Sequence, residues 1–176
     1  MPYGIAAKFA FPERVAVAMV GDGAMQMGGM AEMLTAAKYY KTWVDPRYVV
    51  LVLNNEDLNQ VTWEQRAMEG DPRFEGSQAI PYVSYADWAD LIGLKGIEVT
   101  RSDQLEDAFT EAFAADRPTI VDAHTSPEVP PMPPHVTFEQ ARALMSSVAA
   151  DPHAGLAGAK EGVREMIHEL MRPERR

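Results

Sequence analysis

The 176-residue sequence lacks cysteine. Disulfides, thiolate zinc sites, iron–sulfur clusters and cysteine nucleophiles are therefore excluded, and such a chain fits a cytoplasmic location. Long apolar runs are also absent: none approaches the roughly 18 residues of a membrane-spanning helix, and no charged-then-apolar leader indicates a secretory signal. Basic residues are few, since 16 Lys and Arg stand against 26 Asp and Glu, which gives a net charge of −10. This charge argues against nucleic-acid binding, and it implies that a phosphate ligand must be met by backbone dipoles and a metal ion.

Apolar residues make up 47% of the chain, which is enough for a sizeable core in one domain. Short apolar runs alternate with segments of helical periodicity, and this order is typical of a mainly parallel sheet with helices on its faces. We therefore predict an α/β three-layer sandwich. The expected strands cover residues 15–20, 48–53, 96–100 and 119–124, and the expected helices cover residues 24–40, 84–91, 102–115 and 137–150.

Local signals refine these elements. The runs at 15–20 and 48–53 are continuously apolar, so both strands are expected to be buried on both faces. Ser84 and Thr137 begin capping boxes, and Ser102 or Asp103 is expected to cap the helix between them. The first helix should bury an apolar stripe that consists of Met27, Met30, Ala31, Leu34 and Ala37.

The C-terminal part has a different composition. Residues 127–134 hold five prolines, which predicts an extended surface strap. A last helix is expected in the tail, with one apolar face formed by Val163, Met166, Ile167, Leu170 and Met171. Its polar face mixes acidic and basic residues, so we expect it to pack on the domain or on a second subunit rather than on a membrane. We accordingly divide the chain into an α/β domain, residues 1–150, and a helical tail, residues 151–176.

Two polar turns follow neighbouring strands of the predicted sheet. Gly21-Asp22-Gly23 ends the first strand, and Asn54-Asn55 ends the second. Either turn alone is an ordinary turn sequence. A right-handed helical crossover, however, places the carboxyl ends of two such strands side by side, where ligands bind in parallel sheets. The pair is therefore a stronger signal than either turn.

The residue types in these turns suit a metal-bound diphosphate. Asp22 offers a carboxylate oxygen, Asn55 offers an amide oxygen, and the main-chain carbonyl of Asp57 could add a third ligand. Three such oxygens, with a water and two phosphate oxygens, complete an octahedral Mg²⁺ site. Gly21 and Gly23 allow a ligand to approach the backbone closely, and the helix that begins at Ala24 points free N–H groups at it.

These residues resemble a known signature. Gly-Asp-Gly, a helix and Asn-Asn are similar to the diphosphate-binding domain of thiamine diphosphate enzymes, in the pyruvate oxidase and acetolactate synthase family. The likeness extends over residues 2–148, and it is greatest to bacterial pyruvate oxidases of the quinone type. The segments that carry it, besides the two turns, are Pro12-Glu13-Arg14, residues 88–99, Ile120-Val-Asp-Ala123 and Pro130-Pro-Met-Pro-Pro134.

The resemblance implies roles for individual residues. It implies that Asp22 and Asn55 ligate Mg²⁺ through their side chains and Asp57 through its carbonyl, while the N–H groups of Gly23 and Ala24 hold the diphosphate. The expected reaction is decarboxylation of a 2-oxo acid such as pyruvate, followed by oxidation or carboligation.

The resemblance also implies missing parts. Family members bind the cofactor between this domain and a pyrimidine-binding domain, usually of another subunit, which supplies a catalytic Glu. No Glu here can be assigned that role, so no catalytic residue is predicted and we expect the chain to be inactive alone. The turn that bends the cofactor is expected upstream of Pro2, and FAD is expected only in a full-length enzyme. A homo-oligomer is expected.

Three other interpretations remain open at this point. The chain could be the small subunit of a two-chain thiamine-dependent enzyme, a self-associating module without activity, or an unrelated Mg²⁺-dependent phosphate binder. Other residues carry weaker signals: Glu32 is expected at the surface or an interface, and His124 in a structural role. Substrate selection is assigned weakly to Gln60, Trp63 and Glu64.

Overall fold

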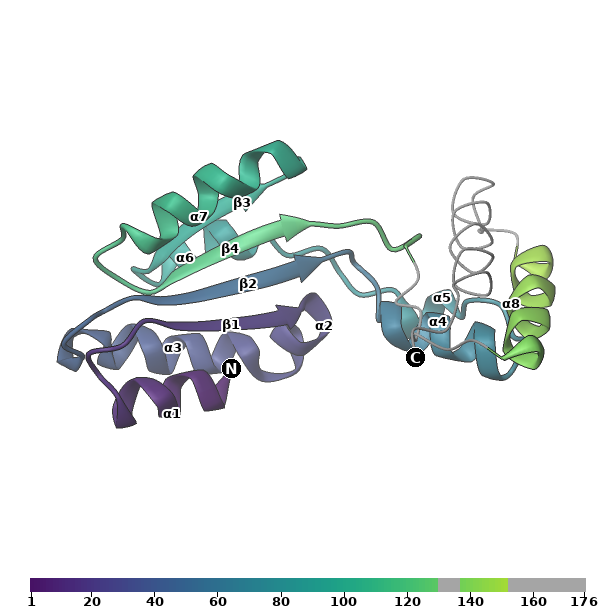
Figure 1. Ribbon diagram of the computed structural model, residues 1–176, viewed down its shortest axis with the longest axis horizontal. Coiled ribbons are helices and arrows are strands. Elements are labelled where there is room, and N and C mark those ends of the chain that lie inside the picture. The colour runs from purple at the N-terminus through teal and green to yellow at the C-terminus, as the bar shows by residue number, and fades with distance from the viewer. Residues whose placement is uncertain (130–136, 152–176) are drawn as a thin grey trace, which may run out of the picture. The chain divides into compact units, whose positions relative to one another are not determined.

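The computed structural model describes residues 1–129 and 137–151 (Figure 1). The chain divides into two compact units, each assembled from two segments. The first unit comprises residues 1–55 and 81–125, and the second comprises residues 56–80 and 126–176. The predicted tail helix and most of the proline strap lie outside the described residues. The division of the chain at residue 150 therefore stays a prediction.

The first unit contains a parallel four-stranded sheet with the strand order β1-β2-β4-β3. Its strands are β1 (Ala16–Gly21), β2 (Tyr48–Asn54), β3 (Lys95–Val99) and β4 (Thr119–His124). All four lie within one or two residues of the predicted ranges. With helices packed on both faces, this sheet confirms the predicted α/β class. The carboxyl ends of β1, β2 and β4 lie together in register, because Gly21 pairs with Leu53 and Leu53 with Ala123.

Helices cover the two faces of the sheet unequally (Figure 1). Val50 and Val52 of β2 pack in one core cluster with residues of α1 (Pro2–Ala10), α3 (Met30–Tyr39) and α6 (Tyr85–Leu91). Val49 and Leu51 face the opposite side and pack against α7 (Leu105–Phe113). The strand β2 is thus buried on both faces, as its continuous apolar run predicts.

The same prediction is wrong for β1. Its residues alternate between half-buried and exposed, which is the pattern of an edge strand covered on one face. Val17 and Met19 lie in register with Val49 and Leu51, yet they are 52% and 68% exposed. The reason is that α7 packs on β3 and β4 and does not extend over β1.

The first predicted helix is interrupted. It begins as α2 (Asp22–Ala24), passes through a π-helical turn, η1 (Met25–Gly29), and continues as α3. A π turn adds one residue to the helix, so the side chains of α3 are rotated about the helix axis relative to those of α2. The predicted stripe is therefore partly wrong, because Met27 and Leu34 are 78% and 52% exposed. The buried positions are instead Met25, Gly29, Met33 and Ala36.

Two of the predicted caps are present. The Ser84 hydroxyl accepts a hydrogen bond from the Asp87 N–H at 3.2 Å, and Thr137 forms a reciprocal capping box with Gln140. The third expectation is wrong, since the segment opens as a 3₁₀ turn, η3 (Ser102–Gln104), before α7 begins. There the side-chain carbonyl of Gln104 accepts from the N–H groups of Thr100 and Arg101.

The second unit is helical in its described part. It contains α4 (Asn59–Met68), α5 (Glu75–Gln78) and α8 (Phe138–Ala150). Trp63 of α4 packs with Ala141 and Leu144 of α8 in a small apolar cluster. A buried ion pair of 2.5 Å joins Arg66 to Asp151 directly after α8. Within the described ranges, no helix combines the length and the hydropathy needed to cross a bilayer.

Candidate cofactor site

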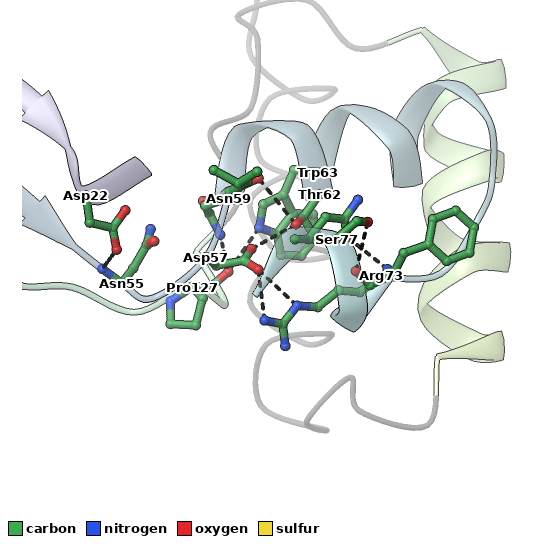
Figure 2. A network of polar contacts seen from close by, with 12 residues as sticks. Asp22, Asn55, Asp57, Asn59, Thr62, Trp63, Arg73, Ser77 and Pro127 are labelled. Carbon is green, nitrogen blue, oxygen red and sulfur yellow. Dashed lines mark hydrogen bonds and ion pairs between the residues drawn. The ribbon is translucent and has the colours of Figure 1, made fainter. Parts of the chain in front are cut away.

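Asp22 and Asn55 meet at the carboxyl edge of the sheet. Asp22 is the first residue after β1 and is almost fully buried. Its Oδ2 atom accepts a hydrogen bond from the Asn55 N–H at 2.8 Å (Figure 2), and its Oδ1 atom accepts from the Gly23 N–H at 2.9 Å. The structure therefore brings together the two turns that the sequence predicts to be neighbours, and the carboxylate of Asp22 joins them.

Asn54 and Asn55 differ in burial and in their contacts. Asn54 is buried, and its Nδ2 atom donates to Asp122 Oδ1 at 3.0 Å and to the Val83 carbonyl at 3.2 Å. Asn55 follows the end of β2 and is only half-buried. Asn54 is thus held inward by the sheet, which leaves Asn55 as the asparagine beside the Asp22 carboxylate.

Asp57 belongs to the second unit, where its side chain is fully engaged. Its carboxylate accepts from the Thr62 hydroxyl at 2.8 Å and pairs with Arg73 at 2.9 Å (Figure 2). The intervening residue, Glu56, has a φ of 59°, so the chain turns sharply between Asn55 and Asp57. The carboxylate of Asp57 is thus held by residues of its own unit, and a metal-binding role for its main-chain carbonyl stays a prediction.

The backbone next to Asp22 is exposed at Gly21. A methyl group built on Gly21 would meet no atom within 4 Å, and the backbone angles there, φ −81° and ψ 160°, suit any residue. Neither packing nor backbone conformation therefore requires glycine at this position. A glycine here would, however, allow a ligand to approach the main chain closely.

The donor set suits a hard cation bound by mixed ligands. In the described ranges, no three His, Asp or Glu side chains gather as a metal site. A carboxylate, a side-chain amide and a carbonyl are nevertheless ligands that Mg²⁺ accepts, because it keeps waters and phosphate oxygens in its remaining positions. The N–H groups of Gly23 and Ala24 lie in the first turn of α2, where a helix offers no main-chain acceptor, and that of Gly23 donates to the Asp22 carboxylate.

A buried polar network lies behind the turns. Asp122 Oδ2 accepts from the Tyr85 N–H at 2.8 Å, and the Tyr85 hydroxyl donates to the Asp22 carbonyl at 3.2 Å. Burial raises the pKa of Asp122 above its usual range, although hydrogen bonds from Asn54 and from the start of α6 oppose the shift. The sequence did not predict this network, and its visible signal was the aspartate between Val121 and Ala123 in β4.

Contacts are also defined for the other candidate residues. His124 ends β4 and its Nε2 atom lies 3.1 Å from Glu98 Oε1, which fits the structural role expected of it. Glu32 is half-buried in α3. Gln60 bonds Glu64 on the surface of α4. Trp63 is buried in the second unit, and its Nε1 atom donates to the Pro127 carbonyl at 3.1 Å (Figure 2).

Comparison with known proteins decides the family. The family model described as "Thiamine pyrophosphate enzyme, C-terminal TPP binding domain" matches residues 1–123. The chain belongs to this TPP-binding domain family. The chain spans about a fifth of the length of the curated relatives it matches.

Individual relatives extend the match. The chain is 37% identical to YdaP of Bacillus subtilis (strain 168) over 142 residues, which cover 81% of this chain and 23% of that protein. It is 31% identical to the acetolactate synthase large subunit of Haemophilus influenzae, over 64% of this chain and 18% of that protein. Benzoylformate decarboxylase of Pseudomonas aeruginosa is 26% identical over 71% of this chain and 22% of that protein.

A solved structure shares the fold of this chain. The thiamine diphosphate-dependent 4-hydroxybenzoylformate decarboxylase of Rhodococcus jostii RHA1 superposes with a TM-score of 0.61 at 24% identity. The match covers 72% of this chain and 22% of that chain. At this identity the likeness shows a common fold, and it agrees with the α/β class predicted from the sequence.

Proposed function

We propose that this chain is the diphosphate- and Mg²⁺-binding part of a thiamine diphosphate-dependent enzyme that acts on a 2-oxo acid. The observation that carries the proposal is the 2.8 Å hydrogen bond between Asp22 Oδ2 and the Asn55 N–H, at the carboxyl ends of two neighbouring parallel strands. This is the position at which parallel sheets bind ligands. Family membership narrows the ligand to thiamine diphosphate.

The residues at this edge fit the cofactor in three respects. Asp22 and Asn55 would hold Mg²⁺ through their side-chain oxygens, and the Asp57 carbonyl remains the third ligand proposed from the resemblance. The N–H groups of Gly23 and Ala24 would bind the diphosphate at the start of a helix. Open space beside Gly21 would admit it to the backbone. The metal would offset the repulsion between an anionic ligand and a chain of net charge −10.

The chemistry follows from the cofactor, and the protein supplies binding and orientation. Thiamine diphosphate, when bound, supplies the electron sink for decarboxylation of a 2-oxo acid. The Asp22 carboxylate would place an oxygen ligand on the cation, and the main-chain N–H groups after it would bind the diphosphate. None of these residues is proposed to exchange protons with the substrate.

The whole enzyme is proposed to be larger than this chain, since the chain spans about a fifth of its relatives. We propose a pyrimidine-binding domain from another chain or subunit, a homo-oligomer and, in the full enzyme, FAD. The substrate is proposed to be pyruvate, as in quinone-type pyruvate oxidases, and this chain alone is proposed to be inactive. In the alternative arrangement, this chain is a small subunit and a separate pyrimidine-binding chain completes the same cofactor site.

Calorimetric titration of thiamine diphosphate into the purified chain tests the proposal. We expect thiamine diphosphate to bind in the presence of Mg²⁺ and not in EDTA. We also expect Asp22→Asn to abolish binding, because the amide lacks the negative charge that the carboxylate offers to the cation. Asp103→Asn is the matched control, since Asp103 is an exposed aspartate in an ion pair with Arg101. Absence of binding by the unmodified chain, or equal binding by Asp22→Asn, contradicts the proposal. Equal affinity for ADP would favour a general diphosphate binder.

A further inference from the structure

The hydroxyl of Tyr85 contacts the metal-site turn from behind. Tyr85 is the first residue of α6 and its side chain is fully buried. The hydroxyl donates to the Asp22 carbonyl at 3.2 Å and accepts from Gln26 Nε2 at 3.1 Å. Gln26 Nε2 also donates to the Pro81 carbonyl at 2.8 Å. The Tyr85 hydroxyl thus links the main chain of Asp22 to the side chain of Gln26, four residues further along the chain.

The position of Tyr85 is itself fixed by β4. Its N–H donates to Asp122 Oδ2, and Asp122 Oδ1 accepts from Asn54, the residue before Asn55. One buried carboxylate therefore holds both the start of α6 and the end of β2. Through Tyr85, Asp122 is connected to the main chain of Asp22, and through Asn54 it is connected to Asn55. Asp22 and Asn55 are the two sides of the proposed Mg²⁺ site.

The helical segment after Asp22 constrains the main chain of Asp22 less than a regular α-helix would. The α2 segment has three residues, and the π turn after it contains Gly28 with non-helical backbone angles. The regular ladder of α-helical hydrogen bonds in α3 therefore does not continue to Asp22. Gln26 lies in this π turn, and its side chain makes the contacts that anchor it.

We propose that Tyr85 is a positioning residue for the metal-binding turn. Its hydroxyl, together with Gln26, fixes the main chain of Asp22 so that the carboxylate is presented beside Asn55. This inference rests on the proposed function, because it assigns a task at the same site. Mg²⁺ demands near-ideal octahedral geometry, so a small displacement of one ligand weakens its binding. Tyr85 would act through Asp22 and would touch neither the metal nor the cofactor.

Tyr85→Phe tests this directly, because it retains the buried ring and removes only the hydroxyl. We expect the Mg²⁺ concentration for half-maximal thiamine diphosphate binding to rise about tenfold or more. In the free chain, we expect the amide hydrogen of Asn55, which donates to the Asp22 carboxylate, to exchange about tenfold faster. Amides in the centre of β2 should exchange as in the unmodified chain.

Tyr48→Phe is the matched control. Tyr48 is also a fully buried tyrosine of the first unit, and its hydroxyl donates to a main-chain carbonyl, that of Met1, at 3.1 Å. It makes no hydrogen bond to either turn, so both readouts should stay at the unmodified values. Gln26→Met is a second variant that acts on the same turn from its partly exposed side, and it should change both readouts in the same direction as Tyr85→Phe.

The outcomes separate the two ideas. If the unmodified chain binds the cofactor with Mg²⁺ but Tyr85→Phe changes only one readout or neither, the positioning role is wrong and the proposed function stands. A lower melting temperature with unchanged Mg²⁺ dependence also overturns it, since that is the result of a purely structural role. If the unmodified chain shows no Mg²⁺-dependent binding, the proposed function itself fails, and the positioning role fails with it.

Discussion

Alanine at Gly21 should separate the stability of the domain from its ability to bind the cofactor. The added methyl meets no atom within 4 Å, and φ −81° with ψ 160° lies in the extended region open to any residue. At such a position Gly→Ala stabilises a protein by about 0.4–1 kcal/mol, because the unfolded chain loses conformational freedom. For a chain of this size, that corresponds to a melting temperature higher by about 1–4 °C.

Binding should change in the opposite direction. The same methyl would occupy the space through which the proposed diphosphate approaches the backbone after β1. We expect Gly21→Ala to lower the affinity for thiamine diphosphate with Mg²⁺ by at least about tenfold, which is about 1.4 kcal/mol. Thermal unfolding of the free chain and calorimetry in saturating Mg²⁺ measure the two effects independently.

Gly96→Ala provides the contrast within the same sheet. A methyl at Gly96 would lie 2.0 Å from the Ala86 carbonyl oxygen, so α6 and β3 must move apart. Overpacking of this kind costs about 1–3 kcal/mol or more and should lower the melting temperature by several degrees. The reasoning about Gly21 would be refuted by a comparable loss of stability in Gly21→Ala, or by cofactor affinity equal to that of the unmodified chain.

Three further changes test electrostatic contacts. Arg47 holds the pKa of Asp45 down at about 2, so Asp45→Asn should be less stable than the unmodified chain in urea at pH 5, and this difference should shrink as the pH falls from 3.8 towards 2. Burial raises the pKa of Asp122, so this group should respond in the opposite sense. Relative to Asp122→Asn, the unmodified chain should gain stability as the pH falls towards 3.8. Arg66→Met should lower the free energy of unfolding in urea by about 3 kcal/mol, because it removes the cation that faces the buried Asp151 carboxylate. Adding Asp151→Asn should recover part of that loss, and a double variant no more stable than Arg66→Met would contradict this reason.

The sheet could be predicted from the sequence because apolar runs carry most of the information about buried strands. For β2 the run from Tyr48 to Leu53 led to the correct burial on both faces. The similar run in β1 did not, because burial of Val17 and Met19 depends on how far α7 extends, and α7 lies about 90 residues later in the sequence. Helix α4 was missed for a related reason: its sequence is mostly polar, and the partner that buries Trp63 is the distant α8.

The candidate site was predictable to the extent that topology alone determines it. The crossover rule was sufficient to bring Asp22 beside Asn55. Periodicity could not identify the π turn, so Met27 was wrongly assigned to the core. Nor could spacing reveal Tyr85, because its hydroxyl bonds a main-chain atom 63 positions away. Contacts between a side chain and the distant backbone leave no pattern in the sequence.

The strand order has a consequence for the synthesis of this protein. All four strands are parallel, so the sheet contains no local hairpin, and Val49 of β2 pairs with Thr119 of β4, 70 residues later. At about 5–20 residues per second, a ribosome takes roughly 4–14 s to make the partner of β2. Throughout that interval the most apolar strand of the sheet is without its central neighbour. Slow, non-local pairing of this kind exposes nascent chains to aggregation. Cooler growth or added chaperone should therefore raise the soluble yield.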